Sequence, residues 1–489
     1  MRKLLLLLPW TALAQTEFPH GVASGDVTPT GVTLWTRANR ETTLTLEVGG
    51  EPRREVAVTA DGDFTAKVRV EGLTPGTLYT YRWRDGEAAS DEGVFRTAPE
   101  PSARQRVKFA FSGDSDGTLV NGEPGLNRFE VLDAIREENP DFFIYLGDTI
   151  YADSERRGPR GPAVTLEDYR ETYRVNRGYA ALRRLLASTA AYVQWDDHEV
   201  RNDYAGETVS KDLFAAGRQA FLEYMPVEAP TDDAEGCAAA PLYRVFRWGA
   251  DVELFILDER SCRSASAEPR CTASGQSRGD IAPTLPSLVR LLAGLPIAPP
   301  TGCLDAINRP GRSLLGPAQM ARFREALRRS AARFKFVISE VAISNLYAYP
   351  YDRWEGYAAE RTAFLEFLRA EPGLRGVIFL TTDMHANIIQ DVAVDRLANT
   401  PAITTEFITG PIAAVPLQRE LGALGFPPSL LGQFKSLLGA ACAELDSFGY
   451  GVVEVDPEAG SATITLKDQT GQVLGPDAAC RKSITAPAP

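Results

Sequence analysis

The sequence has 489 residues, of which 44% are hydrophobic and 24% charged, and its formal net charge at pH 7 is −13. This composition is typical of a globular chain and excludes a disordered, collagen-like or membrane-spanning protein. The acidic balance also argues against a nucleic-acid scaffold and against docking to anionic membranes, because both need a surplus of Lys and Arg on the surface.

Residues 1–14, MRKLLLLLPWTALA, have the pattern of a cleaved secretory signal, with two cations, a short Leu core and an Ala-x-Ala ending. The apolar run is shorter than the roughly 20 residues that span a bilayer. The sequence therefore predicts a secreted or periplasmic protein that has no stable membrane anchor and begins near Gln15 when mature.

Residues 15–100 predict a small N-terminal β-sandwich domain. Six short runs alternate between hydrophobic and polar residues and are separated by turn residues: GVTLWTR, TTLTLEV, REVAVTA, FTAKVRV, YTYRWRD and GVFRTAP. The aromatic residues in these runs are interpreted as sheet-face or core residues rather than as a sugar-binding platform: Trp35, Tyr79, Tyr81 and Trp83. A Pro-rich linker, TAPEPSARQR, ends the domain.

Residues 105–489 predict an α/β domain in which helices flank a layered β-sheet core. Six apolar strands end in small or acidic residues: VKFAFSGD, DFFIYLGD, AYVQWDD, VELFILDE, FKFVISE and VIFLTTD. Helical patterns separate some of these strands, as in NRFEVLDAIREEN, YAALRRLLAST and GPAQMARFREALRRSAAR. Near the C-terminus, GYGVVEVD and SATITLKDQTG predict a β-hairpin that returns to the sheet.

The cysteines are even in number and lie in the second half of the chain: Cys237, Cys262, Cys271, Cys303, Cys442 and Cys480. An even set in an exported chain favours disulfides, and the spacing lacks a CxxC zinc pattern. We expect up to three structural bridges, with the pairing left open. Residues 262–312, rich in Pro and holding three of the cysteines, are interpreted as a cysteine-tethered surface insertion.

Candidate site residues follow the predicted strands, where ligands of α/β sheets gather. Four strands are followed by an aspartate: Asp114, Asp148, Asp197 and Asp383. Two of the three histidines, His198 in WDDHE and His385 in TTDMH, stand beside these carboxylates. A buried structural His could explain one such motif, but two of them favour a functional site.

The segment GDTIYAD places Tyr151 three residues after Asp148. A carboxylate at a strand end can bridge two cations, and a phenolate three residues later can bind one of them, especially a hard trivalent ion. A helix N-cap Asp with a packed Tyr is the structural alternative. In FSGDSDG, Gly neighbours let Asp114 and Asp116 approach a metal or a phosphate, whereas a solvated turn is the alternative.

Together these motifs supply hard oxygen ligands and two imidazoles, a set suited to two closely spaced cations. Such a pair generates hydroxide from water and binds both oxygens of an in-line displacement at phosphorus. In order and spacing the motifs resemble the binuclear metallophosphoesterase pattern GDxG…GDxxY…GN/DHE…GHxH.

The chain resembles the PhoD-type alkaline phosphatase family more closely, through LGDTIYAD, QWDDHEVRNDY, the YDRWEGY…ER segment and FGYGVVEV. The opening FPHGVASGDVTPTGVTLWTR is similar to the N-terminal β domain of that family. The resemblance covers nearly the whole mature chain. It implies a metallophosphoesterase-like fold and a secreted, metal-dependent phosphatase that hydrolyses phosphate mono- or diesters by attack of a metal-bound hydroxide on phosphorus.

The resemblance also implies the metal ligands. Six residues would hold two metals: the bridging Asp148; Asp114, Tyr151 and His385 at the first metal; and Asp197 and Asp383 at the second. His198 would contact the substrate, stabilising the phosphorane or protonating the leaving oxygen.

Arg201 and Asn202 follow His198 closely and could contact the non-bridging phosphate oxygens. Arg suits a bidentate phosphate contact, and surface ion pairing is the alternative for Arg201. His20, in the β domain, is interpreted as a packing or hydrogen-bonding residue rather than a ligand, and Trp354 either lines the cleft or packs in the core.

Two departures from the family pattern affect the expected metals. Many PhoD-type enzymes have a Cys iron ligand where this chain has Asp114. Tyr151 still favours iron, the oxygen-rich set suits calcium at the second site, and other divalent metals stay open. No histidine remains for the VxxH position of related phosphatases, where Glu340 or Asn345 could substitute.

Two other functions stay open. A phospholipase D-like phosphodiesterase fits the same resemblance, although the lack of a basic amphipathic stretch favours small soluble phosphate esters over lipid esters as substrates. A calcium-stabilised extracellular binding protein would keep the fold without the chemistry. That alternative would not need an unliganded His198 inside an acidic cluster.

Overall fold

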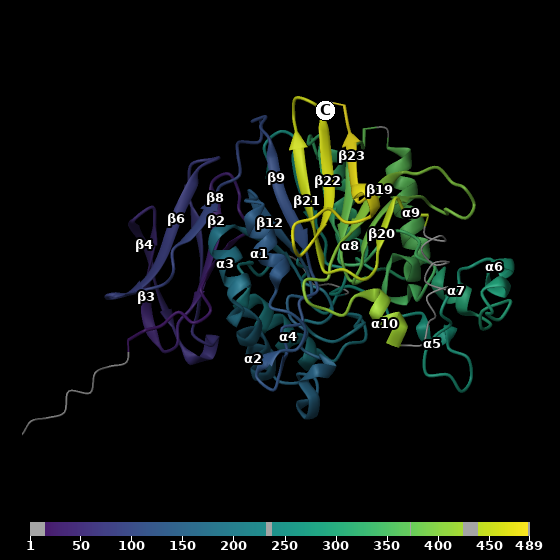
Figure 1. The fold of residues 1–489 in the computed structure, drawn as a ribbon, viewed down its shortest axis with the longest axis horizontal. Helices are drawn as coiled ribbons and strands as arrows, with labels where there is room; N and C mark the ends of the chain where they lie inside the picture. Colours follow the sequence, from purple (N-terminus) through teal and green to yellow (C-terminus); the bar gives the residue numbers. More distant parts are fainter. Residues whose placement is uncertain (1–14, 231–236, 372, 424–438, 488–489) are drawn as a thin grey trace, which may run out of the picture.

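The computed structural model describes residues 15–230, 237–371, 373–423 and 439–487. The predicted signal segment, 1–14, lies outside the described residues. Two large β-sheets pack against each other with helices on their outer faces, and a smaller sheet of N-terminal strands lies at one end of the molecule (Figure 1).

The first large sheet has nine strands in the order β23 (Arg481–Thr485), β22 (Ser461–Asp468), β21 (Gly449–Asp456), β9 (Val107–Ser112), β12 (Phe142–Leu146), β13 (Ala191–Gln194), β1 (Val22–Gly25), β2 (Gly31–Arg37) and β5 (Thr65–Glu71). Strands β9, β12 and β13 are parallel, which places their carboxyl ends at one edge. The predicted C-terminal hairpin is confirmed, because β21 and β22 pair antiparallel and β21 joins the sheet beside β9.

The second large sheet has seven strands in the order β14 (Arg244–Trp248), β15 (Val252–Ile256), β16 (Phe334–Ile338), β17 (Val377–Thr381), β19 (Thr404–Ile408), β18 (Asn387–Val392) and β20 (Cys442–Glu444). The four strands β15, β16, β17 and β19 are parallel. Alternate side chains of the two sheets, such as Phe109 and Phe336, meet in one buried core (ring centroids 5.1 Å apart). Because these strands are buried on both faces, their sequences are nearly continuous runs of apolar residues.

The N-terminal strands form a sandwich, as predicted. One layer contains β4 (Glu51–Val58), β3 (Thr42–Val48), β6 (Leu78–Asp85), β7 (Ala88–Ala89) and β8 (Gly93–Arg96), and the other contains β1, β2 and β5. The second layer is continuous with the nine-stranded sheet, since β1 pairs with β13 at Gly25 and Ala191. A Cβ on Gly25 would lie 2.8 Å from the Ala191 carbonyl oxygen, so this close approach requires glycine.

Helices cover the outer face of each large sheet, giving four layers. The nine-stranded sheet is covered by α1 (Glu130–Glu137), α2 (Leu166–Gly178), α3 (Ala180–Ser188) and α4 (Lys211–Tyr224), and the seven-stranded sheet by α8 (Pro317–Arg329) and α9 (Ala358–Ala370). The predicted helix in GPAQMARFREALRRSAAR is α8, which buries Met320, Phe323 and Leu327 but ends before Ala331, because Ser330 is extended and turns the chain toward β16. The layered α/β fold class is confirmed.

The remaining elements are short. They are β10 (Leu119–Val120), β11 (Glu123–Pro124), α5 (Glu268–Cys271), α6 (Ser287–Leu292), α7 (Cys303–Ile307), α10 (Leu417–Ala423) and the 3₁₀ turns η1 (Ala60–Gly62), η2 (Glu155–Arg160), η3 (Pro350–Asp352), η4 (Trp354–Tyr357) and η5 (Pro476–Ala478). Within the described ranges, no helix has the length and apolarity needed to cross a membrane.

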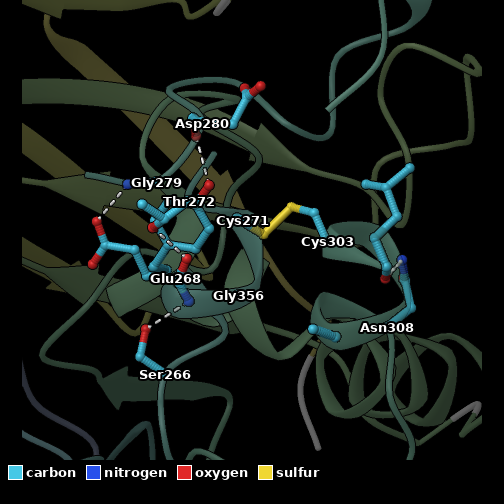
Figure 2. The surroundings of a disulfide bond; sticks show 12 residues. Ser266, Glu268, Cys271, Thr272, Gly279, Asp280, Cys303, Asn308 and Gly356 are labelled. Carbon is cyan, nitrogen blue, oxygen red and sulfur yellow. Dashed lines mark hydrogen bonds between the residues drawn. A yellow bond between two sulfur atoms is a disulfide. The ribbon is translucent and has the colours of Figure 1, made fainter. Parts of the chain in front are cut away.

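The six cysteines form three disulfides, which confirms the predicted bridges and establishes their pairing: Cys237–Cys262, Cys271–Cys303 and Cys442–Cys480. The second bridge joins α5 to α7 inside the predicted insertion (Figure 2). The third joins β20 of the seven-stranded sheet to the residue that precedes β23 of the nine-stranded sheet.

Candidate metal centre

The site is built where strands of both large sheets end. Asp114, Asp148 and Asp197 follow β9, β12 and β13 within three residues, and Asp383 follows β17 equally closely. Asp114, Asp148 and Asp383 have positive φ angles of 60°, 46° and 67°, and His385 has one of 48°. Left-handed backbone at non-glycine residues costs of the order of 1–3 kcal/mol each, and such strain clusters at functional sites.

Three groups of side chains bring their possible ligand atoms within 4.8 Å of one another. They are Asp114, Asp148 and His385; Asp148, Asp197 and His198; and Asp197, Asp203 and Asp352. Asp148 belongs to the first two groups and Asp197 to the last two. The groups therefore form a continuous row in which two carboxylates are shared between neighbours.

The electrostatics of this row favour cations. Burial, together with the nearby carboxylates of Asp197 and Asp196, raises the pKa of Asp148 well above its usual range. One oxygen of Asp197, Oδ1, is buried and has no hydrogen-bond partner, and the same holds for Oδ2 of Asp196. Orphaned carboxylate oxygens beside other carboxylates are costly unless a positive charge lies between them. The residues present therefore fit a group of hard cations.

Tyr151 lies beside the first group. Its Oη is 2.8 Å from Nε2 of His385, and its ring stacks on the ring of His198 with centroids 4.0 Å apart. Nδ1 of His385 faces the carbonyl oxygen of Val415 at 2.9 Å, which leaves Nε2 as the nitrogen directed at the site. The phenol is thus placed where it could add an oxygen ligand to Asp114, Asp148 and His385.

His198 is held by a carboxylate that the sequence did not single out. Its Nδ1 lies 2.5 Å from Oδ1 of Asp153, while Oδ2 of Asp153 accepts from the backbone N–H of Asn202 at 2.7 Å. The imidazole is therefore fixed through Nδ1, and Nε2 is the nitrogen left to contact a metal or a substrate. Asp153 is the last residue of the GDTIYAD segment that was singled out in the sequence. Nothing in its spacing from His198 indicated that the two side chains would meet.

Asp203 and Asp352 were also missed as candidate ligands. Asp203 donates its backbone N–H to Oδ2 of Asp197 at 2.6 Å, and Asp352 lies on η3, far away in the sequence. Both belong to segments that carry the family resemblance, RNDY and YDRWEGY, and that was the only signal available.

Arg260 is a fully buried counter-ion of the acidic row, which the sequence also did not indicate. Its Nε donates to Asp196 at 2.6 Å, and its two terminal nitrogens donate to the two oxygens of Asp352 at 2.8 Å each. A fixed guanidinium of this kind offsets part of the repulsion among the carboxylates.

Three further predicted residues lie near the row without belonging to its three groups. Asp383 does not join any of the three groups, although burial and the nearby Asp352 and Asp197 raise its pKa to about 7. Arg201 donates to the carbonyl oxygen of Ala163 at 2.7 Å. Asp116 accepts from the hydroxyl of Ser154 at 2.7 Å rather than joining a group.

The remaining predicted residues are all tied into the protein. Glu340 is buried and accepts from the backbone N–H of Glu259 at 3.1 Å, and Asn345 donates to Glu355 at 3.4 Å. Trp354 is fully buried and donates from its indole to Glu259 at 2.7 Å, so it packs in the core. His20 is buried in the N-terminal sandwich beside Arg37 (Nδ1 to Nη1, 3.5 Å).

Glu199, the last residue of WDDHE, connects two of the ligand-bearing loops. It accepts from the backbone N–H and the hydroxyl of Thr149, each at 2.6 Å, and from the backbone N–H of Asp196 at 2.9 Å. This carboxylate therefore fixes the loop after β12 against the loop after β13, which sets the spacing of Asp148 and Asp197.

Comparison with known proteins gives two family matches. Residues 121–464 match the PhoD-like phosphatase family, and residues 8–99 match the N-terminal domain of PhoD-like phosphatases. Alkaline phosphatase D of Bacillus subtilis (strain 168) is 27% identical over 425 residues. That alignment covers 77% of this chain but only 66% of the relative, so the chain spans slightly less than two thirds of its length.

Solved structures show the same fold. A structure of PhoD superimposes with a TM-score of 0.74 at 21% identity and covers 97% of this chain and 93% of its own. A purple acid phosphatase from yellow lupin (Lupinus luteus) seeds superimposes with a TM-score of 0.54 at 11% identity, covering 95% of this chain and 73% of its own. Both matches include the two-sheet core whose strand ends carry the acidic row.

Proposed function

The chain belongs to the PhoD-like phosphatase family, and on this premise we propose that it is a metal-dependent phosphatase that hydrolyses phosphate mono- or diesters. The family resemblance expected from the sequence is thereby confirmed. The observation that carries the proposal is the row of three donor groups joined through Asp148 and Asp197 at the strand ends. Bound there, the cations would lower the pKa of a water molecule and stabilise negative charge on the phosphoryl oxygens.

We propose that Asp148 is the carboxylate shared by two metals, with Asp114, His385 and Tyr151 around the first. Two cations a few ångström apart repel each other strongly, and a shared carboxylate offsets that repulsion. The placement of Asp148 in two donor groups and of the Tyr151 hydroxyl beside His385 supports these roles. Asp197 and Asp383 are proposed to bind the second metal, and the nearness of Asp383 to Asp197 and Asp352 supports this.

Iron at the first site and calcium at the others are proposed from the family resemblance and from the donor chemistry. A phenol oxygen is a good ligand for a hard trivalent ion, and carboxylate-only groups such as Asp197, Asp203 and Asp352 suit calcium. Metal analysis of the purified protein tests this assignment, together with a search for the visible absorption band of a tyrosinate bound to iron(III).

His198 is proposed to contact the substrate through Nε2. The hydrogen bond from Nδ1 to Asp153 holds the ring in place and favours its protonated form, which suits donation of a proton to the leaving oxygen. Arg201 and Asn202 are proposed phosphate contacts at the rim. Arg201 keeps one terminal nitrogen on the Ala163 carbonyl, so its other N–H groups would make that contact.

Export is proposed as well, and the three disulfides support it, because such bonds persist in oxidising compartments. Small soluble phosphate esters are the proposed substrates. N-terminal sequencing of the extracellular or periplasmic protein tests the predicted start near Gln15.

The decisive test of the function pairs an activity assay with metal analysis. The wild-type protein should hydrolyse a chromogenic phosphomonoester or its bis-ester, and a chelator should abolish that activity. Asp148→Asn keeps the shape of the side chain but removes its charge, so it should lose bound metal and activity together. A metal-loaded wild-type protein that hydrolyses neither ester would contradict the proposal and favour the binding-protein alternative.

A further inference from the structure

The insertion between 262 and 312 exposes an unusual number of apolar side chains. Of the ten large hydrophobic side chains that are exposed in the described ranges, five lie between residues 288 and 304. Leu288, Leu291 and Leu292 on α6 are 68%, 57% and 79% exposed, and Ile297 on the following loop is 61% exposed. We refer to these four residues as the apolar patch.

The three leucines lie at positions i, i+3 and i+4 of α6, so they share one face of the helix. The charged residue of this helix, Arg290, points the other way and is only 1% exposed. Its terminal nitrogens donate to the two oxygens of Asp280 at 2.9 and 2.7 Å, and its Nε donates to the carbonyl oxygen of Pro296 at 2.8 Å. The orientation is the reverse of an ordinary surface helix, which turns its cation outward and its leucines inward.

Several contacts hold the insertion in this orientation. The Cys271–Cys303 bridge ties α5 to α7, and Glu268 accepts from the backbone N–H of Gly279 at 2.9 Å (Figure 2). The hydroxyl of Tyr351 donates to the carbonyl oxygen of Asp280 at 2.6 Å. These contacts fix the part of the insertion that carries the exposed leucines. Helix α6 lies at the end of the molecule opposite the N-terminal sheet (Figure 1).

The charge around the apolar patch indicates which kind of partner could bind there. Residues 281–302 contain one charged side chain, Arg290, and it is buried and neutralised by Asp280. The segment 281–302 is thus without exposed charge on a chain whose net charge is −13, which favours neither an acidic nor a basic partner and opposes anionic lipids. A stable dimer needs about 20 residues on each side, more than four side chains on one short helix and its following loop provide.

We propose that the apolar patch docks this protein reversibly on a zwitterionic phospholipid surface. Leu288, Leu291, Leu292 and Ile297 enter the boundary between the headgroups and the acyl chains, while the paired Arg290 and Asp280 remain inside the protein. Apolar side chains on a segment that exposes no cation of its own give weak attachment rather than anchoring. This docking does not depend on the proposed catalytic function, since it uses no residue of the metal centre.

The test measures partitioning of the full-length mature protein, with its disulfides intact, onto phosphatidylcholine vesicles by co-sedimentation. The wild-type protein should bind, and Leu291→Ser/Leu292→Ser should lower the partition coefficient about 100-fold, roughly tenfold for each leucine removed from the interface. Leu78→Ser/Val245→Ser is the matched control, because both residues are exposed on strands elsewhere and binding should not change. All three proteins should hydrolyse a soluble phosphate ester equally, which separates this test from the test of the proposed function.

A Leu292→Trp variant gives a direct readout, since its emission should shift to shorter wavelength when the vesicles are added. Four results would overturn the proposal. They are no binding of the wild type to phosphatidylcholine, equal binding by the double-serine variant, binding that requires anionic lipid, and a wild-type dimer that the double-serine variant abolishes.

Discussion

His198 is held at Nδ1 by a carboxylate, and His385 shares this kind of contact. Asp153 lies 2.5 Å from Nδ1 of His198, and Nδ1 of His385 faces both the carbonyl oxygen of Val415 at 2.9 Å and the carboxylate of Glu420 at 3.2 Å. His385 differs in its Nε2, which lies 2.8 Å from the hydroxyl of Tyr151 in the first donor group. Acid catalysis requires a nitrogen that carries a proton, and a carboxylate partner favours that state. We therefore expect His198→Ala to keep its metal while turnover falls by about 10²–10⁴, the usual contribution of a positioned acid or base.

The loss should be largest for esters with poor leaving groups, which most need a proton, and smaller for activated aryl phosphates. Metal analysis and turnover measured on both ester types check this expectation. Asp153→Asn provides a graded control and should cause a smaller loss with a shifted pH profile, because the imidazole stays but its partner is neutral. Loss of metal in His198→Ala would instead make His198 a ligand, and full activity on every ester would exclude a catalytic role.

His20, which lies outside the metal centre, is expected to make the free energy of unfolding depend on pH. Burial, with added repulsion from Arg37, Arg177 and Arg174, lowers the pKa of His20 to about 3, and only Asp63 acts in the opposite direction. The folded state thus holds a neutral imidazole where the unfolded chain, with a pKa near 6.5, binds a proton. This contribution to stability is complete above about pH 6.5 and declines as the pH falls toward 3.

At pH 5 the decline amounts to about 2 kcal/mol of unfolding free energy. Denaturant unfolding of the wild type and of His20→Gln between pH 7 and pH 4 measures it, since the variant has no proton to bind at this position. The difference in stability between the two proteins should shrink with falling pH. A difference that stays constant over this range would show that His20 is protonated equally in both states.

At the scale of elements, the Cys271–Cys303 bridge holds the insertion that carries α5, α6 and α7. The two cysteines are 32 residues apart in the sequence, so the bridge restricts the unfolded chain by about 3–4 kcal/mol in the loop-entropy account. Cys271→Ser/Cys303→Ser should therefore lower stability by up to that amount. The loss should appear first as faster proteolysis between 262 and 312, because local segments open before the whole protein does.

The variant that replaces Cys442 and Cys480 is the comparison, because its bridge lies outside the insertion and should leave proteolysis of 262–312 unchanged. Thiol titration of the denatured protein should find no free thiol before reduction and six after it. Unaltered proteolysis and unfolding in the Cys271→Ser/Cys303→Ser variant would show that the other contacts alone hold the insertion.

The strands and their terminal aspartates could be predicted because burial on both faces leaves an apolar run, and polar residues within three positions of its end mark the end of the strand. Asp114, Asp148 and Asp197 follow this rule. Asp203 and Asp352 do not, because neither follows a strand directly. Asp203 lies six residues after Asp197 in the same loop, and Asp352 lies on η3, which approaches Asp197 only once the two sheets have packed. The pairing of β1 with β13 is also non-local. The alternating pattern of β1 and β2 predicts strands, but it does not indicate which distant strand pairs with β1.

At the scale of the whole molecule, the two large sheets meet in an apolar core, and two of the further connections between them are the third disulfide and the metal centre. One is the Cys442–Cys480 bridge between β20 and the start of β23. The other is the acidic row, in which Asp114, Asp148 and Asp197 follow strands of one sheet while His385 and Asp352 follow strands of the other. Metal binding is therefore expected to hold the sheets together as well as to serve catalysis.

A chelator should then destabilise the protein. A cation present at about 100 times its dissociation constant adds about 2.7 kcal/mol to the unfolding free energy if it binds only the folded state, and several sites add more. Denaturant unfolding with and without chelator measures this loss, with bound metal quantified in parallel. Asp148→Asn is the control, because a protein that cannot bind the shared cations should unfold alike in both conditions. If the chelator strips the metal from the wild type and leaves its unfolding curve unchanged, the cations do not join the sheets, and the apolar core with the Cys442–Cys480 bridge is sufficient.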